Sequence, residues 1–125
     1  MFVQIGDKKF RYSFKHFTQE EDVHYEMLRR KESGGYIPRY YPSAITQVFI
    51  EEQRESGDEW VKVPPAGEAF CSELDNFSKE TGRKVALTRA LKDLFPEDFE
   101  VREAFWKNYF DRKPKKWDGD VEPSI

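Results

Sequence analysis

The chain has little cysteine and no long apolar run. Its 125 residues include one cysteine, Cys71, which cannot form an internal disulfide, so a reducing compartment is expected. No segment approaches the length of a membrane-spanning helix, and the N-terminal stretch lacks the apolar core of a signal peptide. We therefore expect a protein of the cytoplasm that has no membrane partner.

An excess of basic charge is also missing. The chain has 21 Lys and Arg against 24 Asp and Glu, a net charge of −3, which does not suit a general nucleic-acid binder. Any nucleic-acid site must then be a local basic patch. Apolar residues make up 38% and aromatic residues 16%, so much of the core must be aromatic. The length suits one domain, expected over residues 1–114, with a flexible tail over 115–125.

The motifs of common enzyme classes do not occur in the sequence. There is no phosphate-binding loop, dinucleotide fingerprint or nucleophile elbow. His16, His24 and Cys71 do not have the spacing of a zinc site. Because Cys71 lies in a predicted strand, we expect a buried, inert thiol rather than a nucleophile activated by His24. The sequence therefore predicts a non-enzymatic protein without a metal or cofactor.

Hydrophobic periodicity predicts an α+β fold, with an antiparallel sheet of three to five strands and helices packed on one face. A capping box at 18–21 should open a helix that ends before Gly34, and Pro96 should begin a last helix. The expected strands are 2–5, 10–14, 44–53, 59–63 and 67–72. The expected core residues are Phe49, Trp60, Val61, Phe70, Leu87, Leu91, Leu94, Phe105, Trp106 and Tyr109.

The segment from Gly67 to Phe95 predicts a strand, a polar turn and an amphipathic helix, and two starts of that helix remain open. If Thr81 caps it, Arg83 and Lys84 lie in the first turn, where the helix dipole disfavours cations unless an anion is near. If Ser78 or Asp75 caps it, Glu80 pairs with Lys84 four residues on. An internal carboxylate such as Glu73 or Asp75 is the rival of an anionic ligand.

Two sets of residues are therefore candidates for binding. Cations near the helix start suit nucleic acid or another anion: Lys79, Arg83, Lys84 and Arg89. The extended loop 36–42 carries two prolines and three tyrosines. Such tyrosines often pack on their own domain, but loops carry function more often than core elements do. The tyrosines of this loop, together with a tryptophan of the tail, suit a protein partner: Tyr36, Tyr40, Tyr41 and Trp117.

The motifs of this segment resemble those of small, uncharacterised bacteriophage proteins, which share a G-x-A-x-C strand and a G-R-K-x-A-L-x-R-A-L helix. This resemblance implies a viral accessory protein made in a bacterial cytoplasm. The element order over residues 18–95 also resembles the double-stranded-RNA-binding domain, whose second helix begins with cations that straddle phosphates. Here, however, loop 54–58 lacks the usual minor-groove contact residues. A looser likeness links the helix KVALTRALKDLF to single-strand annealing recombinases.

Two functions follow as hypotheses. The first is a phage-type accessory protein that binds nucleic acid through the basic helix start. The alternative is a protein-binding inhibitor of a host defence or nucleic-acid-processing system.

Overall fold

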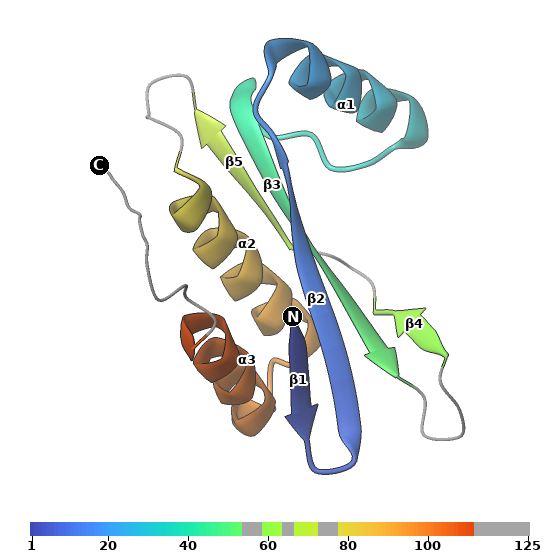
Figure 1. The fold of residues 1–125 in the computed structure, drawn as a ribbon. Helices are drawn as coiled ribbons and strands as arrows, with labels where there is room; N and C mark the ends of the chain where they lie inside the picture. The colour runs from blue at the N-terminus through green and yellow to red at the C-terminus, as the bar shows by residue number, and fades with distance from the viewer. Residues whose placement is uncertain (54–58, 64–66, 73–77, 112–125) are drawn as a thin grey trace.

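The fold is built on one antiparallel sheet with helices on both of its faces (Figure 1). The computed structural model describes residues 1–53, 59–63, 67–72 and 78–111, so Trp117 and the expected boundary at 114 lie outside the described residues. The strands are β1 (Phe2–Ile5), β2 (Lys8–Phe17), β3 (Pro42–Gln53), β4 (Trp60–Lys62) and β5 (Glu68–Ser72). The helices are α1 (Glu20–Ser33), α2 (Lys79–Leu94) and α3 (Phe99–Asp111). The α+β prediction is confirmed.

Strand β3 is the centre of the sheet. It pairs with β2 along one edge, from Phe17 opposite Ile45 to Lys9 opposite Gln53. Its other edge pairs with β5 at one end and with β4 at the other. Because neighbouring side chains of a strand point to opposite faces, this register assigns every strand residue to one of two faces.

One face of the sheet packs against α2 and α3 and forms the main core (Figure 1). Phe10, Tyr12 and Phe105 pack ring against ring there, with centroids 5.4 Å apart for both Phe10–Phe105 and Tyr12–Phe105. Leu87 and Leu91 of α2 are fully buried in the same cluster. The helical stripe read from the sequence is therefore the face that α2 presents to the sheet.

Small residues let β5 and α2 approach closely. Gly67 is buried, and a Cβ added to it would lie 2.1 Å from the Ala86 carbonyl oxygen and 2.6 Å from the Ala90 nitrogen. Ala69 faces the same helix, where Ala86 and Ala90 are fully buried. The glycine and alanines of the phage-like motifs thus meet each other, and their role here is packing.

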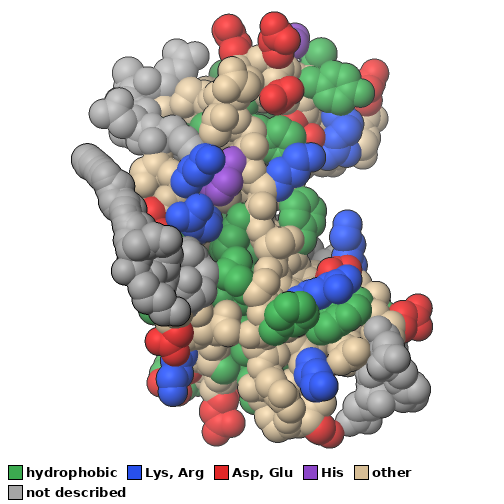
Figure 2. Space-filling view, viewed as in Figure 1, with side chains coloured by type: hydrophobic (Ala, Val, Ile, Leu, Met, Phe, Trp, Pro, Cys, Tyr) green, Lys and Arg blue, Asp and Glu red, His purple; other side chains and the backbone are tan. Residues whose placement is uncertain are grey.

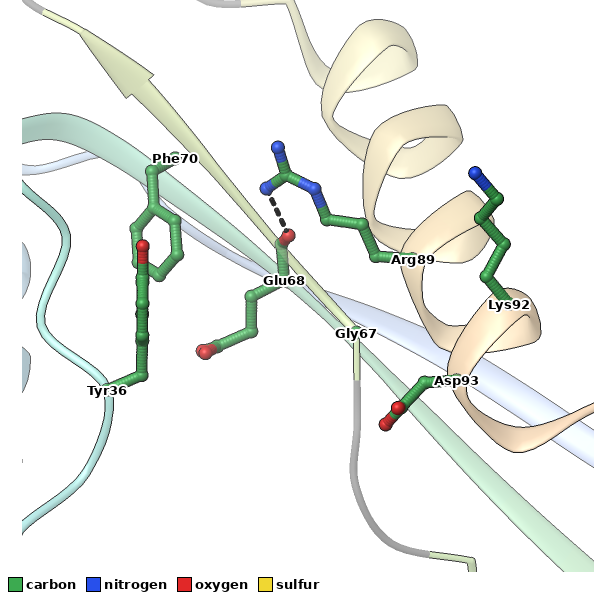
Figure 3. A pocket seen from close by; sticks show the side chains of 7 residues that line it. All are labelled: Tyr36, Gly67, Glu68, Phe70, Arg89, Lys92 and Asp93. Atoms are coloured by element: carbon green, nitrogen blue, oxygen red, sulfur yellow. Dashed lines mark hydrogen bonds between the residues drawn. The ribbon is translucent and has the colours of Figure 1, made fainter. Parts of the chain in front are cut away.

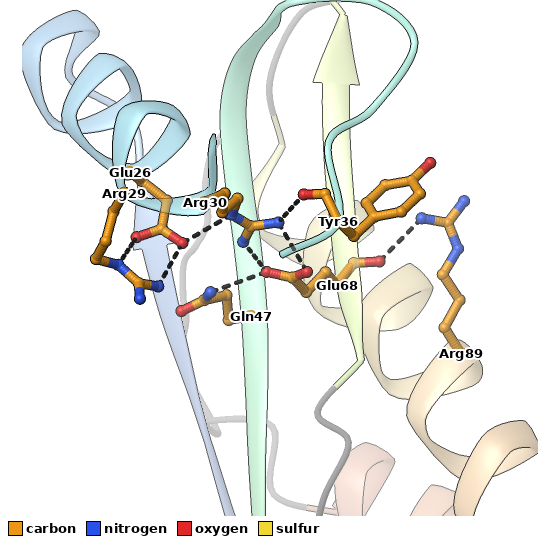
Figure 4. Close-up of polar contacts among 7 residues, drawn as sticks. All are labelled: Glu26, Arg29, Arg30, Tyr36, Gln47, Glu68 and Arg89. Atoms are coloured by element: carbon orange, nitrogen blue, oxygen red, sulfur yellow. Dashed lines mark hydrogen bonds and ion pairs between the residues drawn. The ribbon is translucent and has the colours of Figure 1, made fainter. Parts of the chain in front are cut away.

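Helix α1 covers part of the opposite face, at one end of the sheet, so the expectation of helices on one face holds for α2 and α3. Its Val23 and Met27 pack on Ile45, with Phe17 and Phe70 at the margin. A buried ionic network adds to this contact (Figure 4).

Arg30 is the centre of that network and is 5% exposed. It donates to Glu26 on its own helix, to both carboxylate oxygens of Glu68 on β5, and to the Tyr36 carbonyl. Gln47 of β3 also donates to Glu68, at 2.8 Å. Burial alone would raise the pKa of Glu26, but hydrogen bonds from Arg29 and Arg30 outweigh it and lower that pKa. The network therefore holds α1 against the β3–β5 pair.

Two local predictions are wrong. Thr18 does not cap α1, which begins at Glu20 after Gln19 without a side-chain cap. The reason is that β2 continues to Phe17, which packs beside α1. Only Thr18 and Gln19 then separate the strand from the helix. The last helix begins at Phe99 rather than near Pro96, and the Asp98 carboxylate accepts from the Val101 N–H at 3.3 Å.

The predicted core is right for the helices and wrong for part of the sheet. Leu87, Leu91, Phe105 and Tyr109 are buried, and Leu94 and Trp106 pack against them. Phe70 instead packs at the margin of the α1 cluster. Phe49, Trp60 and Val61 are only half-buried. Phe49 and Trp60 lie on the face away from α2 and α3.

Candidate functional site

Helix α2 has the earlier of its two possible starts. It begins at Lys79, and the Ser78 side chain accepts from the Thr81 N–H at 3.2 Å. Arg83 and Lys84 therefore lie in the second turn: of the two alternatives, the start capped by Ser78 is correct and the start capped by Thr81 is wrong. The unfavourable charge arrangement that suggested an anionic ligand is absent.

Both of these cations have a partner within α2. Arg83 contacts the Glu80 carboxylate at 3.0 Å, and Lys84 lies 3.7 Å from the same carboxylate. Tyr109 of α3 donates to Glu80 at 3.0 Å and accepts from Arg83 at 3.4 Å. The internal carboxylate is thus Glu80, and Arg83 helps to join α2 to α3.

Lys79 and Arg83, at the N-terminal end of α2, lie near His16 and form a small positive cluster. His16 lies on the face of the sheet toward α2 and shares a hydrogen bond of 2.9 Å with Thr46. Burial lowers the pKa of His16, and the charges of Arg83 and Lys79 lower it further. The neutral imidazole is the favoured form, so His16 adds no charge to this cluster near neutral pH.

The three tyrosines of loop 36–42 do not form one site. Tyr36 packs on Phe70 with ring centroids 5.5 Å apart, whereas the Tyr41 hydroxyl lies 2.9 Å from His24 Nδ1 on α1. Tyr40 is 72% exposed. Loop 36–42 therefore contacts β5 at its start and α1 near its end.

Arg89 is separate from the other predicted cations. It projects from α2 toward β5 and donates to the Glu68 backbone carbonyl at 2.9 Å. It thereby shares a pocket with Tyr36, although the sequence placed these two residues in rival sites.

A different surface gathers aromatic and basic side chains, and the sequence prediction missed it. We define the open face as the residues of β1–β4 that point away from α2 and α3 and that α1 does not cover. Register places on it Phe2, Gln4, Lys9, Arg11, Ser13, Lys15, Phe49, Glu51, Gln53, Trp60 and Lys62. Figure 2 shows hydrophobic and basic side chains side by side in its lower right part, where β1, β2 and β4 lie in Figure 1.

The rings and cations of the open face contact each other directly. The Arg11 guanidinium lies 4.5 Å from the centre of the Trp60 ring, and Lys62 Nζ lies 5.3 Å from that of Phe49. Phe2 is 67% exposed and lies 6.0 Å from Trp60, centroid to centroid. At the border with α1, Lys15 lies 4.9 Å from the Phe17 ring. Such cation–π contacts hold the rings and the charges in place together.

The open face is positive in a chain of net negative charge. This face carries four cations, Lys9, Arg11, Lys15 and Lys62, against one carboxylate, Glu51. Arg11 binds Glu51 at 2.6 Å, and this hydrogen bond lowers the pKa of the Glu51 carboxyl. The period-two alternation of Phe49 against buried Val48 and Ile50 is the signal that could have revealed this face from the sequence.

Other chemistry finds little support in the described part of the chain. No group of three or more His, Cys, Asp or Glu is placed to hold a metal there. Cys71 points toward the α2 face, where its thiol donates to the Ser72 carbonyl at 3.5 Å, while His24 lies on α1 over the other face. The two therefore do not form a nucleophile and base. Over the same residues, no helix has the length and apolar character to span a bilayer.

Comparison with known families, curated proteins and solved structures finds no match for this chain.

Proposed function

We propose that this protein binds single-stranded nucleic acid across the open face of its sheet. The observation that carries the proposal is the pairing of exposed or half-buried rings with cations on one sheet face, at Trp60–Arg11 and Phe49–Lys62. Single strands are bound by this combination, because unstacked bases stack on aromatic rings while Lys and Arg contact phosphates. The partner is thus the nucleic acid expected from the sequence, but the proposed site is the open face of the sheet and not the start of α2.

The spacing of the rings supports more than one base contact. Phe2, Trp60 and Phe49 come from three strands, and the first two are 6.0 Å apart. The Ser13 hydroxyl, directly opposite Phe49 in the register, supplies a donor and an acceptor for base edges. A duplex offers no unstacked bases to these rings, so a single strand is the better fit.

The experiment measures fluorescence anisotropy of labelled 20-nucleotide poly-dT and poly-rU, and of a duplex of equal length, over a series of salt concentrations. The single strands should bind more tightly than the duplex. Phe49→Ala should weaken binding by roughly 5- to 150-fold, which corresponds to about 1–3 kcal/mol for one base–ring stack. Lys62→Ala should reduce the slope of log K against log salt by about 0.7, the value for one phosphate of a single strand.

Two controls separate this site from the others. Tyr25→Ala removes a ring that is 72% exposed on α1, away from the open face, and should leave binding unchanged. The double variant Arg83→Ala, Lys84→Ala tests the α2 site and should lower stability without changing the affinity of the folded fraction. Equal affinities of the parent and Phe49→Ala, or a loss of binding only in the α2 variant, would overturn the proposal.

A further inference from the structure

Over the described residues, one edge of strand β5 has no paired strand. Among the described strands it pairs with β3 alone. The Gly67 carbonyl points toward β3, where it accepts from the Val48 N–H at 3.0 Å. Because backbone groups alternate in direction along an antiparallel strand, those of Glu68 and Phe70 point away from β3. Such an edge offers donors and acceptors to another extended segment.

The side chain of Arg89 confirms this direction. Its Nη1 donates to the Glu68 carbonyl at 2.9 Å, from outside the sheet. This contact uses one of the five N–H donors of the guanidinium. No backbone hydrogen bond from another described segment reaches Phe70 on this edge.

A pocket of about 550 Å³ lies along the edge and has two different walls (Figure 3). One wall is aromatic: the rings of Tyr36 and Phe70 are 5.5 Å apart at 41°, on the side of the sheet that α1 covers. The other wall belongs to α2, on the opposite side of the sheet, and carries Arg89 and Lys92. The edge of β5 runs between them.

The charge of the pocket is positive. The Glu68 carboxylate is bound by Arg30 and Gln47, so it is already neutralised within the protein (Figure 4). Arg89 and Lys92 have no carboxylate within ion-pair distance in the described chain, which leaves Asp93 as the one opposing charge of the lining. A ligand with carboxylates complements this wall.

We propose that the β5 edge binds an extended acidic segment of a partner protein, which adds to the sheet as a further strand. Such strand addition uses backbone hydrogen bonds for affinity and alternate side-chain pockets for specificity. Since neighbouring side chains of the added strand point to opposite faces, an apolar residue against Tyr36 and Phe70 places the next residue beside Arg89 and Lys92. The segment should therefore alternate apolar and acidic residues. Arg89 releases the Glu68 carbonyl to the segment and binds its carboxylate.

The first experiment compares two labelled peptides of identical composition. Thr-Phe-Asp-Phe-Asp-Thr alternates its apolar and acidic residues, and Thr-Phe-Phe-Asp-Asp-Thr does not. The alternating peptide should bind the full-length protein at least 10-fold more tightly. Lys92→Ala and Tyr36→Ala should each weaken its binding several-fold, whereas Lys107→Ala, a change at an exposed cation of α3, should not.

The second experiment follows hydrogen exchange of the Phe70 amide by NMR. Saturation with the alternating peptide should slow this exchange, because the peptide carbonyl accepts from that N–H. Unchanged exchange at saturation, or equal affinity for the two peptides, would overturn the proposal. Protection of Phe70 in the free protein that rises with protein concentration would also overturn it, in favour of pairing between two copies of this chain. A shift at Tyr36 on adding adenosine monophosphate, with Phe70 unprotected, would assign the pocket to a small anion instead.

Discussion

Replacing Gly67 with alanine is the sharpest test of how β5 packs on α2. The new Cβ would lie 2.1 Å from the Ala86 carbonyl oxygen and 2.6 Å from the Ala90 nitrogen, both backbone atoms of α2. Non-bonded heavy atoms rest at about 3.5 Å, so β5 and α2 must separate by roughly 1 Å. Overpacking of a core costs about 1–3 kcal/mol. Because no flexible side chain can yield here, we expect a loss near the upper end of that range.

Thermal unfolding followed by circular dichroism measures this loss. A destabilisation of about 3 kcal/mol should lower the Tm by roughly 10 °C or more in a domain of this size. Gly35→Ala is the matched control, because its Cβ would meet nothing closer than Arg30 Cγ at 3.4 Å. That change should alter stability by no more than about 1 kcal/mol. If both variants melted together with the parent, the close approach of β5 and α2 would be refuted.

Two further predictions concern charged groups. Arg30→Met should destabilise by about 3–5 kcal/mol in urea titrations, because it leaves Glu26 and Glu68 without their shared buried partner. Arg29→Met, at a side chain 57% exposed, should cost far less, since water screens its ion pair. Equal losses would contradict the central role of Arg30. Because the pKa of His16 is lowered in the fold, the unfolded chain binds more protons, so stability should fall as pH drops below about 6.5. His16→Gln should flatten the dependence of Tm on pH from 7.5 to 5.5, and an unaltered slope would refute this assignment.

Several expectations remain predictions. The fold does not test three of them: the resemblance to phage proteins, the non-enzymatic character and the nature of the partner. What the structure adds to the resemblance is a physical reason for its motifs, since Gly67 and Ala69 of β5 meet Ala86 and Ala90 of α2. A motif that encodes packing predicts a shared fold rather than a shared activity.

Local patterns in the sequence were enough to predict the elements and one face of each. The stripe through Leu87 and Leu91 identifies the buried side of α2, because helical periodicity depends only on nearby residues. Gly34 ends α1 in the left-handed conformation at φ 79°, as a glycine after a helix predicts. The five strands follow from alternation and from turn residues between them.

Tertiary structure alone decided which face of the sheet each helix covers. The alternation along β3 places Phe49 on one face of the sheet and Val48 and Ile50 on the other. It does not indicate which of these two faces a helix buries, so an aromatic residue of the open face is predicted, wrongly, to be in the core. The contact of Arg30 with Glu68 and the pocket shared by Tyr36 and Arg89 join residues far apart in the chain. Such contacts depend on how β3 pairs with β5 and on where α1 and α2 pack, and no local pattern encodes either.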